Sequence, residues 1–203
     1  MIRAVAWDVD GTLVDSEPNH HAALMKVSAR YGVPIAQNDA RFLGVAAEDV
    51  WKELRPLYPP TLDFQAWIEE IIAAYIGLTA TLAPLPGARE AVETLSRAGV
   101  PQSCVSNSAR RIVDANLAAI RLAKYFAFTI ARQDVQRGKP DPEPYALACH
   151  RFGASPSEVL AVEDSDVGAA SARAAGLRIL RIDPRGDTFS AVVTLVLRDA
   201  AAA

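Results

Sequence analysis

Short apolar segments alternate with helical segments from about residue 88 onward in this 203-residue chain, and this order constrains the fold more than any other feature. The pattern predicts helices over residues 88–98, 109–120, 143–152 and 167–175, and strands over residues 102–105, 126–131, 159–162, 178–182 and 192–197. Strands separated by helices of this length form a parallel sheet with helices on both faces. We therefore predict a doubly wound α/β fold.

The segment before this region predicts one earlier strand and an inserted helical block. Residues 2–7 form a short apolar run that ends at Asp8, as expected for a buried strand. Only helical patterns follow until a proline-rich passage at residues 83–87. We predict a core domain of residues 1–14 and 83–203, and a helical-bundle domain of residues 15–82 inserted after the first strand.

Polar clusters follow three of the predicted strands. They are Asp8 and Asp10 after the first strand, Ser106 and Asn107 after the second, and Glu163 and Asp164 after a later one. In open parallel sheets, ligands bind outside the carboxyl ends of the strands, where such loops converge. The sequence therefore predicts one site built from all three clusters.

The residue types at these positions favour phosphoryl transfer. Several carboxylates share one site only if a cation relieves their repulsion, and Mg²⁺ prefers such oxygen ligands. Asp8 is then a candidate nucleophile and Asp10 a candidate general acid and base. Ser106 and Asn107 offer donors to phosphoryl oxygens, and Lys139, in a proline-flanked loop, offers a fixed positive charge.

Composition excludes several other classes of function. The net charge is -3 and the basic residues are scattered, so we expect no nucleic-acid partner. Cys104 and Cys149 lack CxxC spacing, and the chain has three histidines, so neither zinc nor a disulfide framework is expected. No apolar run reaches membrane-spanning length and no signal peptide precedes Asp8, which predicts a soluble cytoplasmic protein without a membrane partner.

Four motifs, in this order, resemble those of the haloacid dehalogenase superfamily. They are Asp8-Val9-Asp10-Gly11-Thr12-Leu13-Val14-Asp15-Ser16-Glu17, Ser106-Asn107, Lys139-Pro140 and Glu163-Asp164-Ser165. The resemblance covers nearly the whole chain and is strongest to the branch that contains β-phosphoglucomutase and phosphoglycolate phosphatase. It implies a Rossmann-like core with an inserted helical cap domain.

The resemblance also implies roles for the acidic residues. Asp8 is the nucleophile and a ligand of Mg²⁺, and it forms an aspartyl-phosphate. Asp10 is the acid and base, with its backbone carbonyl on the metal. Glu163 and Asp164 complete the metal site.

Outside the acidic residues, the resemblance implies that Ser106 and Lys139 hold the phosphoryl group. Residues 15–82 close over the site as a cap that selects the substrate. Within this cap, His20 and Arg41 are candidate substrate contacts, as is Asn107 in the core. Arg41 suits a carboxylate or a second phosphate of the substrate.

The sequence leaves several functions open. We predict a phosphoric monoester hydrolase acting on a small phosphorylated metabolite, either a sugar phosphate or a phosphoglycolate-like acid. A phosphomutase is the first alternative, although Leu43 and Ala47 stand where the mutase resemblance requires a lysine and an arginine. A 2-haloacid dehalogenase is another, although it has no use for the acid Asp10. A non-catalytic binding protein is a further alternative, and the sequence leaves open whether the protein is a monomer or a homodimer.

Overall fold

The computed structural model describes residues 1–183 and 188–201. The chain divides into two compact units. The core unit comprises Met1–Asp15 and the chain from Ala83 onward, and the helical unit comprises Ser16–Leu82.

The core unit is built on a sheet of five parallel strands in the order β3-β2-β1-β4-β5. The strands are β1 (Ala4–Trp7), β2 (Gln102–Val105), β3 (Phe128–Ile130), β4 (Val159–Glu163) and β5 (Arg178–Arg181). Every residue of β1, β2 and β4 is buried, as expected for central strands covered on both faces. In the register of the sheet, Trp7 lies beside Cys104 on one side and Val162 on the other.

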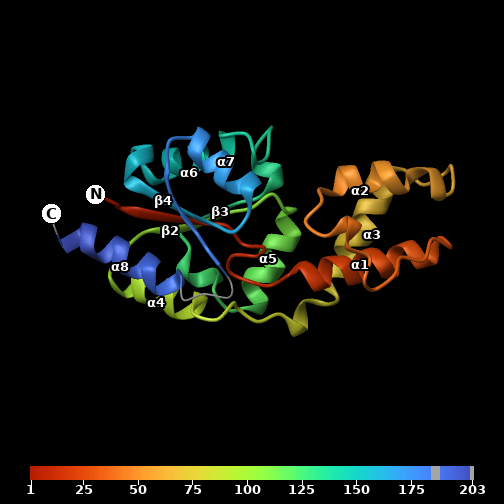
Figure 1. Ribbon diagram of the computed structural model, residues 1–203, viewed down its shortest axis with the longest axis horizontal. Coiled ribbons are helices and arrows are strands. Elements are labelled where there is room, and N and C mark those ends of the chain that lie inside the picture. The colour runs from red at the N-terminus through yellow and green to blue at the C-terminus, as the bar shows by residue number, and fades with distance from the viewer. Residues whose placement is uncertain (184–187, 202–203) are drawn as a thin grey trace. The chain divides into compact units, whose positions relative to one another are not determined.

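Helices cover both faces of this sheet (Figure 1). The helices of the core unit are α4 (Ala88–Arg97), α5 (Arg110–Ala119), α6 (Glu143–Phe152), α7 (Asp166–Ala174) and α8 (Thr188–Ala201), with short 3₁₀ turns at Ala123–Tyr125, Arg132–Asp134 and Pro156–Glu158. Helices α6 and α7 lie on one face, and α4, α5 and α8 lie on the other (Figure 1). This is the arrangement that right-handed crossover connections produce. The predicted doubly wound α/β fold is confirmed.

Residues 192–197 were predicted to form a strand, and this prediction is wrong. They belong to helix α8, even though five of the six are valine or leucine in a run typical of strands. Phe189, Val192 and Val196 are buried, and their spacing places them on one helical face. Packing of α8 against the sheet and α4 therefore overrides the local strand preference.

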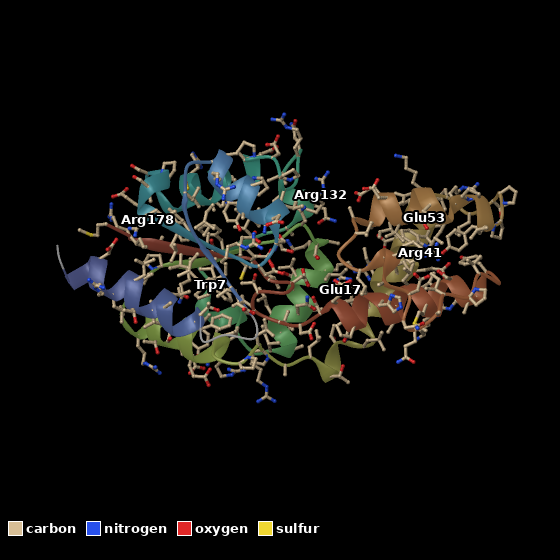
Figure 2. All side chains as sticks on the ribbon, viewed as in Figure 1. Trp7, Glu17, Arg41, Glu53, Arg132 and Arg178 are labelled. Atoms are coloured by element: carbon tan, nitrogen blue, oxygen red, sulfur yellow. The ribbon has the colours of Figure 1, made fainter. Side chains whose placement is uncertain are left out.

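Trp7 packs between the sheet and helix α8. Its indole N–H donates to the side-chain oxygen of Gln102 over 2.9 Å, which satisfies the polar atom of a fully buried ring. The ring stacks on Phe189 of α8 with 6.2 Å between centroids. Figure 2 shows Trp7 inside the core unit. The residue that precedes Asp8 is therefore rigidly packed.

The helical unit consists of three α-helices and short 3₁₀ turns. They are α1 (Glu17–Arg30), α2 (Ala47–Leu54) and α3 (Phe64–Ile76), with turns at Ala40–Phe42, Arg55–Leu57 and Thr79–Thr81. Helix α3 begins where the Asp63 side chain accepts a hydrogen bond of 2.8 Å from the backbone N–H of Ala66. Trp51 packs against Tyr58 and Trp67, so these aromatic rings form part of the unit's own core.

Within the described residues, no helix combines the length and the apolar character needed to cross a membrane.

Candidate active site

Asp8 lies directly after the central strand β1 and is 7% exposed. Its backbone N–H donates to the carbonyl oxygen of Val162 over 2.9 Å, so the hydrogen bonding of the sheet continues through this residue. The carboxyl group therefore projects from a fixed point of the backbone, where the neighbouring strands β2 and β4 also end.

Lys139 is the positive charge beside Asp8. Its ammonium group donates to Asp8 Oδ1 over 2.7 Å, to Glu163 Oε1 over 2.6 Å and to the carbonyl oxygen of Val105 over 2.7 Å. An ammonium group has three protons, and these three acceptors use all of them. The Lys139 side chain is 4% exposed, so these charge-assisted bonds are shielded from water.

Glu163, the last residue of β4, is fully buried behind Lys139. Besides the ammonium group, its Oε1 accepts a hydrogen bond of 2.6 Å from the Tyr145 hydroxyl, and its Oε2 accepts one of 3.3 Å from Ser165. A Cβ atom at Gly168 would stand 2.0 Å from Glu163 Oε1, so only glycine fits there. The surroundings of Glu163 thus orient it towards Lys139.

Asp164, the first residue after β4, is more accessible than Glu163. Its Oδ1 accepts a hydrogen bond of 3.1 Å from the Thr12 hydroxyl. Gly11 has a φ of +78°, and a Cβ atom there would stand 2.2 Å from Asp164 Oδ2. The glycine after Asp10 therefore allows the first loop to approach this carboxylate closely.

The site holds more negative than positive charge. Burial raises the pKa of the Asp8 carboxyl well above its ordinary value; Lys139 opposes this rise, and nearby carboxylates add to it. Burial and the neighbouring Glu163 also raise the pKa of Asp164. Burial alone would lower the pKa of Lys139, but the carboxylates of Asp8 and Glu163 raise it above its ordinary value. One ammonium group does not balance these acids.

The acidic residues fit a hard divalent cation. One carboxylate oxygen from each of Asp8, Glu163 and Asp164 lies within 4.8 Å of the others. Oxygen-only ligands and a local excess of negative charge suit Mg²⁺. Because Glu163 is already bonded to Lys139, Tyr145 and Ser165, Asp8 and Asp164 are better placed than Glu163 to contact the ion directly.

Asp10 points its carboxylate at donors that follow β2. Its Oδ2 accepts a hydrogen bond of 3.2 Å from the Ser106 hydroxyl and one of 2.8 Å from Ser108. Its Oδ1 accepts one of 2.9 Å from the side-chain amide of Asn116 in α5. The structure thus brings Ser106 to the carboxylate of Asp10, while its predicted contact with a phosphoryl group stays a prediction.

Asn107 joins the loop after β2 to the loop of Lys139. Its side-chain amide donates to the carbonyl oxygen of Lys139 over 2.9 Å and accepts from the backbone N–H of the same residue over 2.8 Å. This paired contact fixes the backbone from which the lysine side chain extends. Substrate binding by Asn107 stays a prediction beside this observed structural role.

His20 and Arg41, the other predicted substrate contacts, belong to the helical unit. The His20 ring stacks on Tyr75 with 4.3 Å between centroids. Arg41 forms exposed ion pairs of 2.7 Å with Asp39 and 2.9 Å with Glu53, and Figure 2 shows Arg41 and Glu53 close together. Substrate binding by His20 and Arg41 stays a prediction.

Sequence reasoning did not assign roles to three residues that support the site: Ser108, Asn116 and Tyr145. Asn116 carried a usable signal, because it is a polar residue on the apolar face of a predicted amphipathic helix. Tyr145 carried none, since a tyrosine at a core position of a helix is ordinary, and only the fold shows that its hydroxyl reaches Glu163.

The fold and the site together define an enzyme of the α/β class whose acidic centre lies at the carboxyl ends of β1 and β4. A family model described as haloacid dehalogenase-like hydrolase matches residues 2–176. The chain belongs to this family, and the family predicted from the four motifs is confirmed.

Named relatives and solved structures support the assignment. The chain is 31% identical to a phosphoglycolate phosphatase of Shigella sonnei, covering 86% of this chain and 79% of the relative. It is 29% identical to a phosphorylated carbohydrates phosphatase of Thermotoga maritima, covering 87% and 82%. The crystal structure of CbbY from Rhodobacter sphaeroides in complex with phosphate aligns with a TM-score of 0.81 at 26% identity, covering 94% of this chain and 91% of CbbY. The names of both relatives agree with the predicted phosphoric monoester hydrolase.

Proposed function

We propose that this protein is a Mg²⁺-dependent phosphatase of small phosphorylated metabolites that forms an aspartyl-phosphate on Asp8. The observation that carries the proposal is the convergence of Lys139, Glu163 and Asp164 on the buried carboxyl of Asp8. The site supplies a nucleophile at a fixed strand end, a compensating cation and oxygen ligands for a metal. The phosphatase names of its relatives support the same class of reaction.

In the first step, a carboxylate oxygen of Asp8 attacks the phosphorus atom. The bond from phosphorus to the leaving oxygen breaks, and Asp10 donates its proton to that oxygen, so the alcohol leaves neutral. In the second step, Asp10 takes a proton from water as the water oxygen attacks the phosphorus atom of the aspartyl-phosphate, and the bond from phosphorus to the Asp8 carboxylate oxygen breaks. Inorganic phosphate leaves, and both aspartates return to their starting states.

The other residues stabilise charge during these steps. Lys139 holds Asp8 in position and offsets the negative charge that develops on the transferring group. Asp8, Asp164 and the backbone carbonyl of Asp10 would hold Mg²⁺, with Glu163 behind them. When bound, the ion neutralises charge on the phosphoryl oxygens. The helical unit would act as the cap that selects the substrate.

A screen of sugar phosphates and short phosphorylated acids with Mg²⁺ tests this proposal. We expect phosphate release by the wild-type protein, its loss in the presence of a chelator, and a fall in kcat of at least about 10⁴-fold in Asp8→Asn, which lacks the nucleophile. Circular dichroism checks that the variant is folded. Asp15→Asn, which changes an exposed aspartate of the same segment, is the matched control.

Two outcomes contradict the proposal. Phosphate release by Asp8→Asn at the wild-type rate would exclude Asp8 as the nucleophile. Formation of glucose 6-phosphate from β-glucose 1-phosphate, with a bisphosphate activator and without release of phosphate, would establish the phosphomutase alternative instead.

A further inference from the structure

Asn116 occupies an apolar position of helix α5 although it is a polar residue. The other buried residues of this helix are Ile112, Val113 and Leu117, and Asn116 itself is fully buried. A buried side-chain amide is costly unless it forms hydrogen bonds, so an aliphatic residue is the simpler choice for packing at this position. The presence of asparagine calls for a reason beyond packing.

The amide of Asn116 is bonded to the carboxylate of Asp10. Its Nδ2 donates to Asp10 Oδ1 over 2.9 Å, across 106 positions in the sequence. The other oxygen, Oδ2, accepts from the hydroxyls of Ser106 and Ser108. The carboxylate is therefore held at both oxygens, on one side by a helix and on the other by a loop, and this fixes its rotation about the Cβ–Cγ bond.

We propose that Asn116 is a positioning residue for Asp10 that sets which oxygen of this carboxyl group faces the reaction. The proposal rests on the proposed function, in which Asp10 is the acid and base. An amide N–H only donates, whereas a hydroxyl can donate or accept. Oδ1 is thus tied to a donor that cannot reverse, while the serine hydroxyls beside Oδ2 can turn to accommodate a proton. Asn116 thereby leaves Oδ2 to exchange the proton.

A positioning role and a purely structural role predict different kinetics. Loss of a structural residue loosens the whole site and slows every substrate alike. Loss of an oriented acid slows only substrates whose leaving oxygen needs a proton. Alkyl phosphates need this proton, because an alkoxide is a poor leaving group. p-Nitrophenyl phosphate does not, because p-nitrophenolate is stable near neutral pH.

The test is Asn116→Leu, which keeps a similar volume and suits the apolar face of α5. Release of the leaving group is measured in single turnovers, with enzyme in excess and Mg²⁺ present, for p-nitrophenyl phosphate and for an alkyl phosphate that the wild-type enzyme hydrolyses. We expect the maximal rate constant for the alkyl phosphate to fall on the order of 10-fold to 100-fold, with little change in the enzyme concentration that gives half of this rate. The rate constant for p-nitrophenolate release should stay within about twofold.

Two further variants make the experiment decisive. Val113→Ala changes another fully buried residue of α5 that has no polar side-chain group, and it should affect both substrates equally. Asn116→Asp keeps the shape of the side chain but replaces the donor with a second carboxylate, and it should show the same selective loss. If Asn116→Leu does not fold, Asn116→Asp is used as the test variant.

An equal change for both substrates, or no change for either, in a folded Asn116 variant would overturn the proposal. Failure of the underlying function gives a different result, since acid-quenched wild-type enzyme would then carry no phosphoryl group on Asp8. The two failures are therefore distinguishable in the same set of single-turnover samples.

Discussion

The core unit and the helical unit both contain clusters of charged side chains, but the two clusters are compensated differently. In the core, Lys139 and Glu163 are at most 4% exposed at their side chains, and one ammonium group faces several carboxylates. In the helical unit, the side chains of Arg41 and Glu53 are 64% and 51% exposed and pair with each other in water. Exposed pairs of this kind contribute little to stability, whereas an unbalanced buried cluster is costly. The costly cluster is therefore the one to associate with chemistry.

The buried cluster of the core consists of Asp8, Lys139, Glu163 and Asp164. Removing its lysine should have the largest effect on stability. In Lys139→Met, the carboxylates of Asp8 and Glu163 lose their buried partner, so we expect the free energy of unfolding without Mg²⁺ to fall by about 3–5 kcal/mol. We also expect kcat to fall on the order of 10²-fold to 10³-fold. Urea denaturation and initial rates measure the two effects.

Lys124→Met is the control for this variant, because Lys124 is exposed. If Lys139→Met proves as stable as Lys124→Met at neutral pH, the core cluster is better compensated than its contacts indicate, and the contrast between the two units fails.

Binding of Mg²⁺ should have the next largest effect on stability, and this effect should depend on pH. The folded-state pKa values of Asp8 and Asp164 lie above their unfolded values, so the metal-free fold favours their protonated forms. That contribution to stability is lost as the pH rises from the pKa of an aspartate in the unfolded chain through the raised pKa values of the folded protein. Mg²⁺ binds the ionised carboxylates, so it should raise the unfolding temperature more at about pH 7.5 than at about pH 5.

At a concentration about 100 times its Kd, Mg²⁺ should add about 2.7 kcal/mol to the free energy of unfolding near neutral pH. We expect Asp164→Asn to lose most of this gain. Asp166→Asn, which changes an exposed aspartate two positions further on, should keep it. A gain that is equal at both pH values, or that survives in Asp164→Asn, would assign the ion to another site.

Disruption of the exposed ion pairs in the helical unit should have the smallest effect on stability. Arg41→Met removes the ion pairs with Asp39 and Glu53, and we expect the denaturation midpoint to stay unchanged within error, because water and salt already screen these charges. The same variant tests the predicted substrate contact of Arg41. A KM raised tenfold or more at unchanged kcat, measured with a carboxylate-bearing phosphate ester, would support that contact, and an unchanged KM would contradict it.

Periodicity and local motifs were enough to predict most of the core fold. The strand before Asp8 and the strands ending near Val105 and Glu163 lie where the apolar runs placed them. The error at residues 192–197 has a physical cause. Valine-rich runs fit a strand or a buried helical face equally well over six residues, and only contacts with distant residues such as those of α4 decide between them.

Which residues lie together in the candidate site could be predicted where residue type and position after a strand indicate it, but not where only long-range contacts do. Asp8 and Lys139 were singled out because a carboxylate after a strand and a lysine in a proline-flanked loop have recognisable uses. The geometry then brought them to 2.7 Å of each other. The bonds of Tyr145 to Glu163 and of Asn116 to Asp10 join residues with no shared local pattern, so only the folded chain shows them.

The position of β1 in the sheet has a consequence for how this protein is made. Strand β1, which ends just before Asp8, precedes both of its neighbours, β2 and β4, along the chain, and β4 begins only at Val159. At typical rates of synthesis, the ribosome needs on the order of ten seconds or more to reach that point after completing β1. Until then β1 lacks its neighbour on the β4 side. This unpaired side of an apolar strand can pair with other chains, so the nascent protein must avoid aggregation during this time.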